Sequence, residues 1–129
     1  MTKQAKYSIV IPVGMKPRPK IHEETAAEIL ANHFKSDVHF LETGSQGTPD
    51  VSVQGVEWEL KSPIGGSKNN TRKNMREAGK QSVNIIIDLR RSKLHQTRAL
   101  GYINEYMSTS KKLKHVVVIT KSKRILTIK

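Results

Sequence analysis

The sequence predicts a single α/β (α+β) domain with a mixed central sheet flanked by helices. Its length of 129 residues suits one domain. Segments with strand-like alternation are interleaved with segments of helical spacing, as expected when helices pack on a sheet. The segment "VNIIIDL" (83–89) is almost continuously apolar and predicts a strand that is buried on both faces.

The first half of the chain predicts one helix and four short strands. An apolar segment containing a proline is expected to form an edge strand or an extended lead-in to a proline-rich loop. The helix carries acidic residues in its first turn, where the helix dipole stabilises them. The last two strands surround a Gln-Gly dipeptide and therefore predict a hairpin. The strands are predicted at 7–14, 37–42, 50–53 and 56–61, and the helix at 21–34. Loops are predicted at 15–20 and 43–49.

The second half predicts a glycine-rich loop, a helix, the apolar strand, a second helix and a closing hairpin. The loop is predicted at 62–70, the two helices at 71–82 and 95–107, the apolar strand at 83–89 and the hairpin at 115–129. The complete order is (β)αβββαβαββ. We therefore expect one domain over residues 1–129, with a core at about 20–92 and a C-terminal helix and hairpin at about 94–129.

The composition excludes several classes of site. There is no cysteine, so disulfides, thiol catalysis and cysteine-bound zinc are excluded. No apolar run reaches the length of a membrane span or of a secretory signal. We therefore expect no membrane association, and an activity in the cytoplasm, including that of a target cell.

Positive charge is concentrated in the second half of the chain. The formal net charge is +12, but residues 1–65 carry −1 and residues 66–129 carry +13. A neutral half followed by a strongly basic half indicates a face that binds polyanions, and nucleic acid is the favoured partner. An anionic membrane is disfavoured, because no helix pairs its basic residues with a broad apolar face.

Asp50, Glu59 and Lys61 are predicted to converge at one edge of the sheet. Side chains alternate along a strand, so Glu59 and Lys61 point to the same face, and the hairpin returns Asp50 beside them. Hard divalent cations bind carboxylates, and a nearby ammonium group can orient an attacking water or stabilise charge on a phosphate. This arrangement is typical of phosphodiester cleavage assisted by Mg²⁺, Mn²⁺ or Zn²⁺. The plainer alternative is a strand with surface charges.

The segment "TPD", followed across the hairpin by "ELK", resembles the PD-(D/E)xK nuclease superfamily, also called the restriction-endonuclease-like fold. The core order of that superfamily, αβββαβ, agrees with the elements predicted for residues 21–89. The resemblance implies that a glutamate on the first helix completes the catalytic metal site. Glu24 is favoured, because apolar residues follow it three and six positions later. Glu23 and Glu28 are alternatives, and helix capping is the competing role for all three.

The longer strings "WELKSPIGG" and "KQSVNIIIDLRR" resemble the C-terminal tRNase toxin domains of contact-dependent growth inhibition (CdiA) proteins, over about residues 20–92. This resemblance implies a tRNA nuclease and an acidic immunity protein as its partner. Toxin domains of that kind lie at the end of very large exported proteins. The chain is therefore expected to be such a domain or a free-standing relative.

The helix at 71–82 carries a basic stripe. Arg72, Arg76 and Lys80 are spaced at four-residue intervals, with Lys73 alongside, and this stripe predicts contacts to the phosphates that flank the cut. The alternative is a solvated helix face. In the resembled family the Lys-Gln pair lies near the active centre, so Lys80 and Gln81 are further candidates for substrate contact; capping of the helix is the alternative.

Two rival functions stay open at this point. The first keeps the fold but cleaves or nicks DNA. The second is a basic nucleic-acid-binding module without catalysis, in which Asp50, Glu59 and Lys61 are only structural. The five histidines include no pair with ligand-like spacing, although His95 and His115 could serve a metal-free RNase and His22 could bind a metal.

Overall fold

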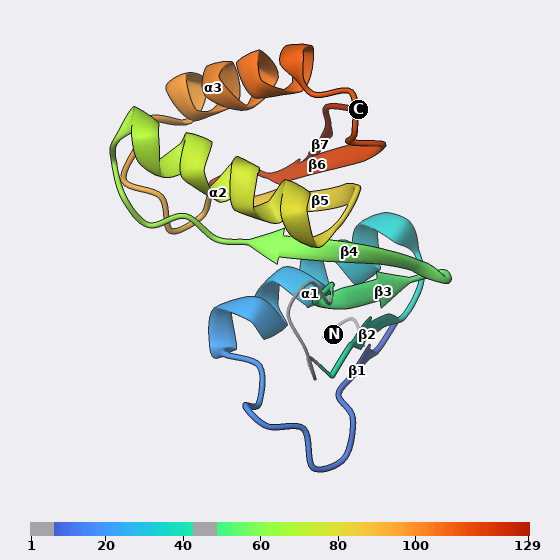
Figure 1. Ribbon diagram of the computed structural model, residues 1–129. Coiled ribbons are helices and arrows are strands. Elements are labelled where there is room, and N and C mark those ends of the chain that lie inside the picture. Colours follow the sequence, from blue (N-terminus) through green and yellow to red (C-terminus); the bar gives the residue numbers. More distant parts are fainter. Residues whose placement is uncertain (1–6, 43–48) are drawn as a thin grey trace.

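A computed structural model describes residues 7–42 and 49–129 (Figure 1). The described elements are β1 (Ile9–Val10), α1 (Ile21–Phe34), β2 (Val38–Phe40), β3 (Val51–Val53), β4 (Val56–Lys61), α2 (Lys68–Gln81), β5 (Asn84–Asp88), α3 (Gln96–Thr109), β6 (His115–Ile119) and β7 (Ile125–Thr127). This order confirms the predicted alternation and the α/β fold class. None of the helices in the described ranges is long and apolar enough to cross a membrane.

The strands form one sheet in which the spatial order follows the chain order from β1 to β7. The pairs β1–β2, β4–β5 and β5–β6 are parallel, and the other three pairs are antiparallel. β3 and β4 form the predicted hairpin. Its two turn residues, Gln54 and Gly55, have φ values of 52° and 81°, the left-handed conformation that a two-residue hairpin of this kind requires.

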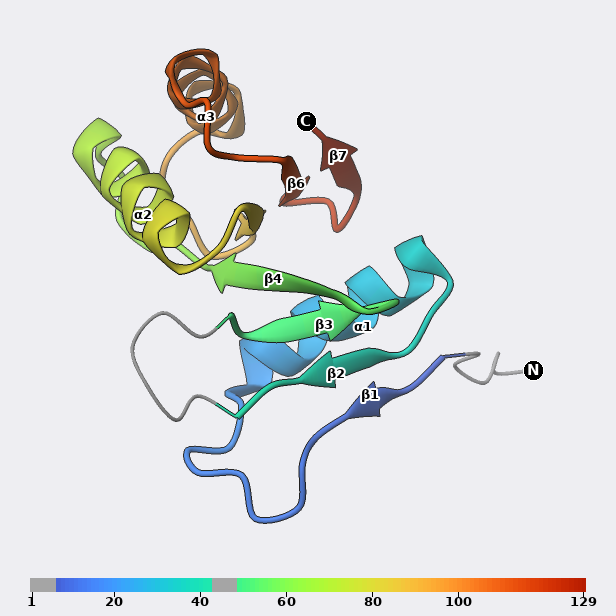
Figure 2. The same cartoon turned by 45° about the vertical axis from the view of Figure 1, so that its right-hand side comes forward.

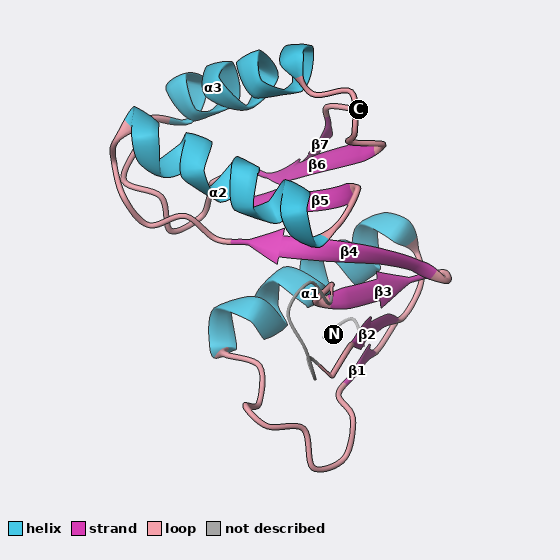
Figure 3. Ribbon diagram, viewed as in Figure 1, coloured by secondary structure: helices cyan, strands magenta, loops and turns pink. Residues whose placement is uncertain are grey.

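Helices cover both faces of the sheet (Figures 2 and 3). α1 packs on one face, where Leu30 belongs to the same buried cluster as Trp58 and Leu60 of β4. α2 and α3 pack on the other face, where Met75 and Ile103 lie in a second cluster with apolar residues of β5 and β6. β5 contributes to both clusters, which confirms the prediction of a strand buried on both faces.

α2 begins three residues earlier than the sequence predicts. The sequence predicts Lys68 in the glycine-rich loop, whereas in the structure it is the first residue of α2. Ser67 caps the helix, because its Oγ accepts a hydrogen bond from the N–H of Asn70 at 3.1 Å. Gly79 does not interrupt the helix; it lies where α2 meets α3, and a Cβ there would stand 3.6 Å from the hydroxyl of Tyr106. Most of the loop predicted at 43–49 lies outside the described residues, which resume at residue 49.

The parallel strands β4, β5 and β6 end along one side of the sheet, here called the carboxyl edge. The loops 62–67, 89–95 and 120–124 leave the sheet at this edge, on the left of Figure 1. β3 runs antiparallel to β4, so its first residue also lies near the end of β4. Ligands of open α/β sheets commonly bind beyond the carboxyl ends of the strands.

Candidate active site

β4 presents its two faces to different layers of the fold. Trp58 and Leu60 are buried in the core beneath α1. Glu59 and Lys61 alternate to the opposite face, in register with two isoleucines of β5 that pack against α2 and α3. The two charged residues of β4 therefore share a face, as the strand periodicity predicts.

The hairpin brings Asp50 beside this pair. The N–H of Asp50 donates to the carbonyl oxygen of Trp58 at 3.0 Å. Its carboxylate oxygen Oδ2 accepts a hydrogen bond from the N–H of Leu60 at 2.9 Å. Because Leu60 stands between Glu59 and Lys61 in the strand, the carboxylate of Asp50 is held at the segment that carries both of them. The structure brings these three predicted residues together.

Glu59 is an almost fully buried carboxyl group, with only 4% of its surface exposed. Burial raises the pKa of Glu59 to about 8, assisted by a hydrogen bond and repulsion from Asp50 and opposed by the positive charge of Lys61. Lys61 Nζ lies 3.5 Å from Glu59 Oε2. No described N–H group or hydroxyl donates to the other buried oxygen, Oε1, and a hydrogen bond between the carboxyl groups of Glu59 and Asp50 requires a proton on one of them. Without a bound cation, this environment therefore favours the protonated form of Glu59.

Asp50 and Glu59 fit a hard divalent cation. They offer two adjacent carboxyl groups, and Glu59 adds a buried oxygen that no described protein donor satisfies. Buried polar atoms without a partner are uncommon in native proteins, and some of them are satisfied by a bound ion. A cation would also favour the ionised form of Glu59 that burial opposes.

Glu24 is not part of this carboxyl pair. Its Oε1 lies 3.8 Å from Nη2 of Arg18, and 30% of its side chain is exposed. Within the described part of the chain, no group of three or more Asp, Glu and His side chains is arranged to hold a metal ion. Glu23 accepts a hydrogen bond from the N–H of the N-cap residue at 2.8 Å, which is the capping role, and lines a small pocket together with Asp50. Two of the three predicted metal ligands are thus brought together.

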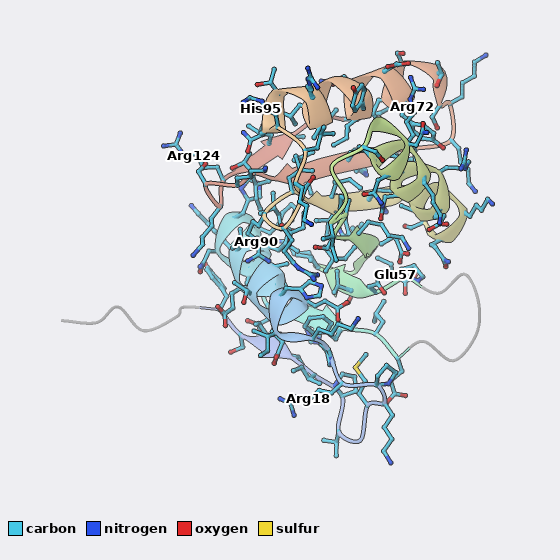
Figure 4. The ribbon with its side chains drawn as sticks, turned by 90° about the vertical axis from the view of Figure 1, so that its left-hand side faces the viewer. Arg18, Glu57, Arg72, Arg90, His95 and Arg124 are labelled. Atoms are coloured by element: carbon cyan, nitrogen blue, oxygen red, sulfur yellow. The ribbon has the colours of Figure 1, made fainter. Side chains whose placement is uncertain are left out.

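The predicted basic stripe of α2 is partly neutralised by acidic side chains. Arg72, labelled in Figure 4, forms an ion pair with Glu105 of α3. Lys73 Nζ lies 4.0 Å from Glu77 Oε1, one turn further along the same helix. Both cations are therefore less available to phosphates than the sequence suggests.

The other members of the stripe are more open. Arg76 and Lys80 are exposed, and Gln81 is half-buried in the last turn of α2. Arg76 also lines a groove between α2 and α3 together with Arg72 and Tyr106. These positions suit contacts with an anionic ligand, and the helix face they occupy lies on the same side of the sheet as Glu59.

Sequence reasoning does not identify Asp88 and Arg90, which form a buried ion pair at the carboxyl edge. Arg90 donates to the Asp88 carboxylate through Nε at 3.0 Å and through Nη2 at 2.7 Å. The same Nη2 donates to the carbonyl oxygen of His22 at 2.8 Å, which ties the end of β5 to the first turn of α1 (Figure 4). An acid that ends a buried strand, followed by two arginines, is the local signal for the pair; the partner on α1 leaves no local signal.

Arg91 also contacts His22. Its Nη1 lies 3.0 Å from His22 Nε2. A guanidinium group can only donate, so this imidazole nitrogen acts as the acceptor. Burial, followed by the charge of Arg91, lowers the pKa of His22. The contact is therefore one between a cation and a neutral ring.

Three further buried oxygens lack a hydrogen-bond partner among the described residues. They are Ser62 Oγ, Asn70 Oδ1 and Thr71 Oγ1, in the segment that follows Lys61 and enters α2. The glycine-rich composition of this segment hides them from a sequence reading. Together with Glu59 Oε1, these oxygens form a polar region at the connection between β4 and α2, in which buried oxygens lack a described hydrogen-bond partner.

The chain is similar to a known family and to a solved structure. Residues 46–125 match the family described as the contact-dependent growth inhibition CdiA C-terminal domain. This chain belongs to that family. A chain of the CdiA-CT/CdiI toxin and immunity complex from Burkholderia pseudomallei is 26% identical, with a TM-score of 0.70 over 95% of this chain and 98% of that chain. No curated protein sequence matches. The expected kinship with CdiA C-terminal domains is therefore confirmed.

Proposed function

We propose that this CdiA C-terminal domain is a metal-dependent endonuclease of the PD-(D/E)xK type that cleaves tRNA in contact-dependent growth inhibition. One observation carries the proposal: Asp50, Glu59 and Lys61 meet on one face of the sheet, and Glu59 has a buried oxygen to which no described N–H group or hydroxyl donates. A surface ion pair would leave both charges in water. Here the carboxyl group is buried, at a cost that a bound cation would offset.

Each residue has a distinct role in this proposal. Asp50 and Glu59 hold Mg²⁺, Mn²⁺ or Zn²⁺, and a bound cation supplies charge that polarises the scissile phosphate. Lys61 orients the attacking water and stabilises the negative charge that develops on the phosphate. Glu24 serves as a third ligand or as a base, for which its side chain must leave Arg18.

The charge distribution supports a nucleic acid as the substrate. The basic second half of the chain includes the open positions Arg76 and Lys80 on the α2 side of the sheet, with Gln81 beside them. Cations on such a face neutralise phosphates and release counterions on binding. The preference for tRNA rests on the likeness of this chain to CdiA tRNase domains.

We also propose that an immunity protein binds this domain. The similar chain from Burkholderia pseudomallei belongs to a complex of a toxin with an immunity protein. A net charge of +12 favours an acidic partner, since complementary charge speeds association and favours the correct complex.

Cleavage assays test the proposal directly. The purified chain is incubated with tRNA and with plasmid DNA, each with Mg²⁺, Mn²⁺ or Zn²⁺ and with EDTA. We expect cleavage of tRNA that EDTA abolishes, and a loss of about 10²-fold or more in Glu59→Gln and Lys61→Met. Glu57→Gln, at an exposed position of the same strand, is the control. Unchanged rates in Glu59→Gln or Lys61→Met would contradict the proposal. Cleavage of plasmid alone would favour the DNA nuclease, and binding without any cleavage would favour the non-catalytic module.

A further inference from the structure

We infer that Arg91, positioned by His22, binds a backbone phosphate of the substrate at the carboxyl edge, on the α1 side of the sheet. This inference rests on the proposed function, because it concerns a contact of the same nucleic acid. It names a second anchoring point, separate from the basic stripe of α2 and contributed by different elements of the fold.

The sheet register places the loop that carries Arg91 at the same edge of the sheet as Lys61. Lys61, the last residue of β4, is paired with Ile87 of the adjacent strand β5. The loop 89–95 therefore begins only two residues beyond the level of Lys61, on a strand about 5 Å away. The N–H of Lys93 donates to the carbonyl oxygen of Ile64 at 3.0 Å, which fastens this loop to the one that follows β4. A strand of nucleic acid crossing the end of β4 would pass this loop.

The surrounding contacts hold Arg91 in place without neutralising it. Arg90 fixes the base of the loop through its bonds to Asp88 and to the carbonyl oxygen of His22. In the described part of the chain, Arg91 has no ion pair, and the partner of its guanidinium is the accepting nitrogen of His22. Asp88 is engaged by Arg90, and Glu23 by the N–H of the N-cap residue. The charge of Arg91 is thus left for a ligand.

The chemistry of the guanidinium group suits a phosphate. Arginine carries five donors in a rigid plane, and His22 engages one nitrogen of Arg91. Its other donors can meet two phosphate oxygens at once, the strong bidentate arrangement of arginine with anions. The contact with the ring also restricts an exposed side chain before the ligand arrives, which reduces the entropy lost on binding.

Binding is measured on a Glu59→Gln background in EDTA, so that no cleavage is needed. Labelled bacterial tRNA is titrated at several salt concentrations. We expect Arg91→Gln to weaken binding by about tenfold and to reduce the slope of log affinity against log salt by about 1. Lys112→Gln removes one exposed charge at the opposite edge, before β6, and is expected to change affinity less than about twofold.

His22→Ala separates positioning from direct contact. If His22 only positions Arg91, this variant weakens binding by a few fold while the salt slope stays unchanged, because the cation is still present. Thermal unfolding of each variant confirms that the fold is intact. Equal affinity and equal slope in Arg91→Gln and Lys112→Gln would overturn the inference. This binding assay does not depend on nuclease activity. If the protein does not cleave tRNA but Arg91→Gln weakens binding as expected, the phosphate subsite is supported and the proposed nuclease function is refuted.

Discussion

Replacing Glu59 with glutamine should remove the part of the pH dependence of stability that Glu59 itself contributes in the cation-free protein. Burial and Asp50 raise the pKa of Glu59 from 4.5 to about 8 in the folded state. Between these two values the folded protein binds more protons than the unfolded chain does. Stability conferred by the protonated carboxyl is therefore fully present below about pH 4.5 and is lost as the pH rises towards 8.

The magnitude follows from the size of the shift. One proton changes the free energy of unfolding by about 1.4 kcal/mol per pH unit, so the full shift sets an upper limit of roughly 5 kcal/mol. Glutamine has nearly the shape of the protonated acid but does not titrate. We expect Glu59→Gln to match the wild type near pH 5 and to exceed it by several kcal/mol at pH 8.

Urea unfolding in EDTA at intervals from pH 5 to pH 8 measures this difference. Glu57→Gln removes an exposed carboxylate from the same strand and should run parallel to the wild type at every pH. Parallel curves for Glu59→Gln and the wild type would refute the reasoning, because they would mean that Glu59 is as well solvated in the folded protein as in the unfolded chain.

Three further predictions concern other parts of the molecule. Asp88→Asn should destabilise the fold by up to about 3–5 kcal/mol in urea unfolding, because its largely buried arginine partner is left without a counter-charge. Arg76→Gln should weaken tRNA binding by a few fold on the Glu59→Gln background, and more than Arg72→Gln does, because Arg72 already has an acidic partner on α3. Gly55→Ala should destabilise by about 1–3 kcal/mol because of its φ of 81°, whereas Gly101→Ala, with no atom within 4 Å of the added Cβ, should stabilise α3 by about 0.5–1 kcal/mol.

The sequence predicts those features whose determinants are close together in the chain. The bounds of α1 agree with the prediction, since a periodic apolar face and acids in the first turn mark a helix locally. Asp50, Glu59 and Lys61 lie within twelve residues and are joined by one tight turn, so strand alternation alone is enough to bring them together. The start of α2 was predicted too late, because the glycines before it obscured the capping role of Ser67.

Features that depend on packing between distant segments could not be predicted in this way. The contact of Arg90 with the carbonyl oxygen of His22 joins residues 68 positions apart. The ion pair of Arg72 with Glu105 spans 33 positions and exists only because α2 packs on α3. A helical wheel of α2 shows Arg72 as one member of a basic stripe, but it gives no information about Glu105 on the neighbouring helix. Local charge patterns thus overestimate how much of a basic face is available to a ligand.

The burial of Glu59 sets its contact with Lys61 apart from a surface ion pair. Its neighbour in register on β5, Ile85, is fully buried, so an apolar side chain at this position would suit the packing better than a carboxyl group does. Lys61 compensates only in part, since the pKa of Glu59 stays high despite an ammonium group 3.5 Å away. Under the proposed function, the position gains a carboxyl group that would exchange its proton for a cation near neutral pH, beside a lysine on the same strand that would contact the bound phosphate. The stability of the fold does not require a buried carboxyl group next to a lysine at this position.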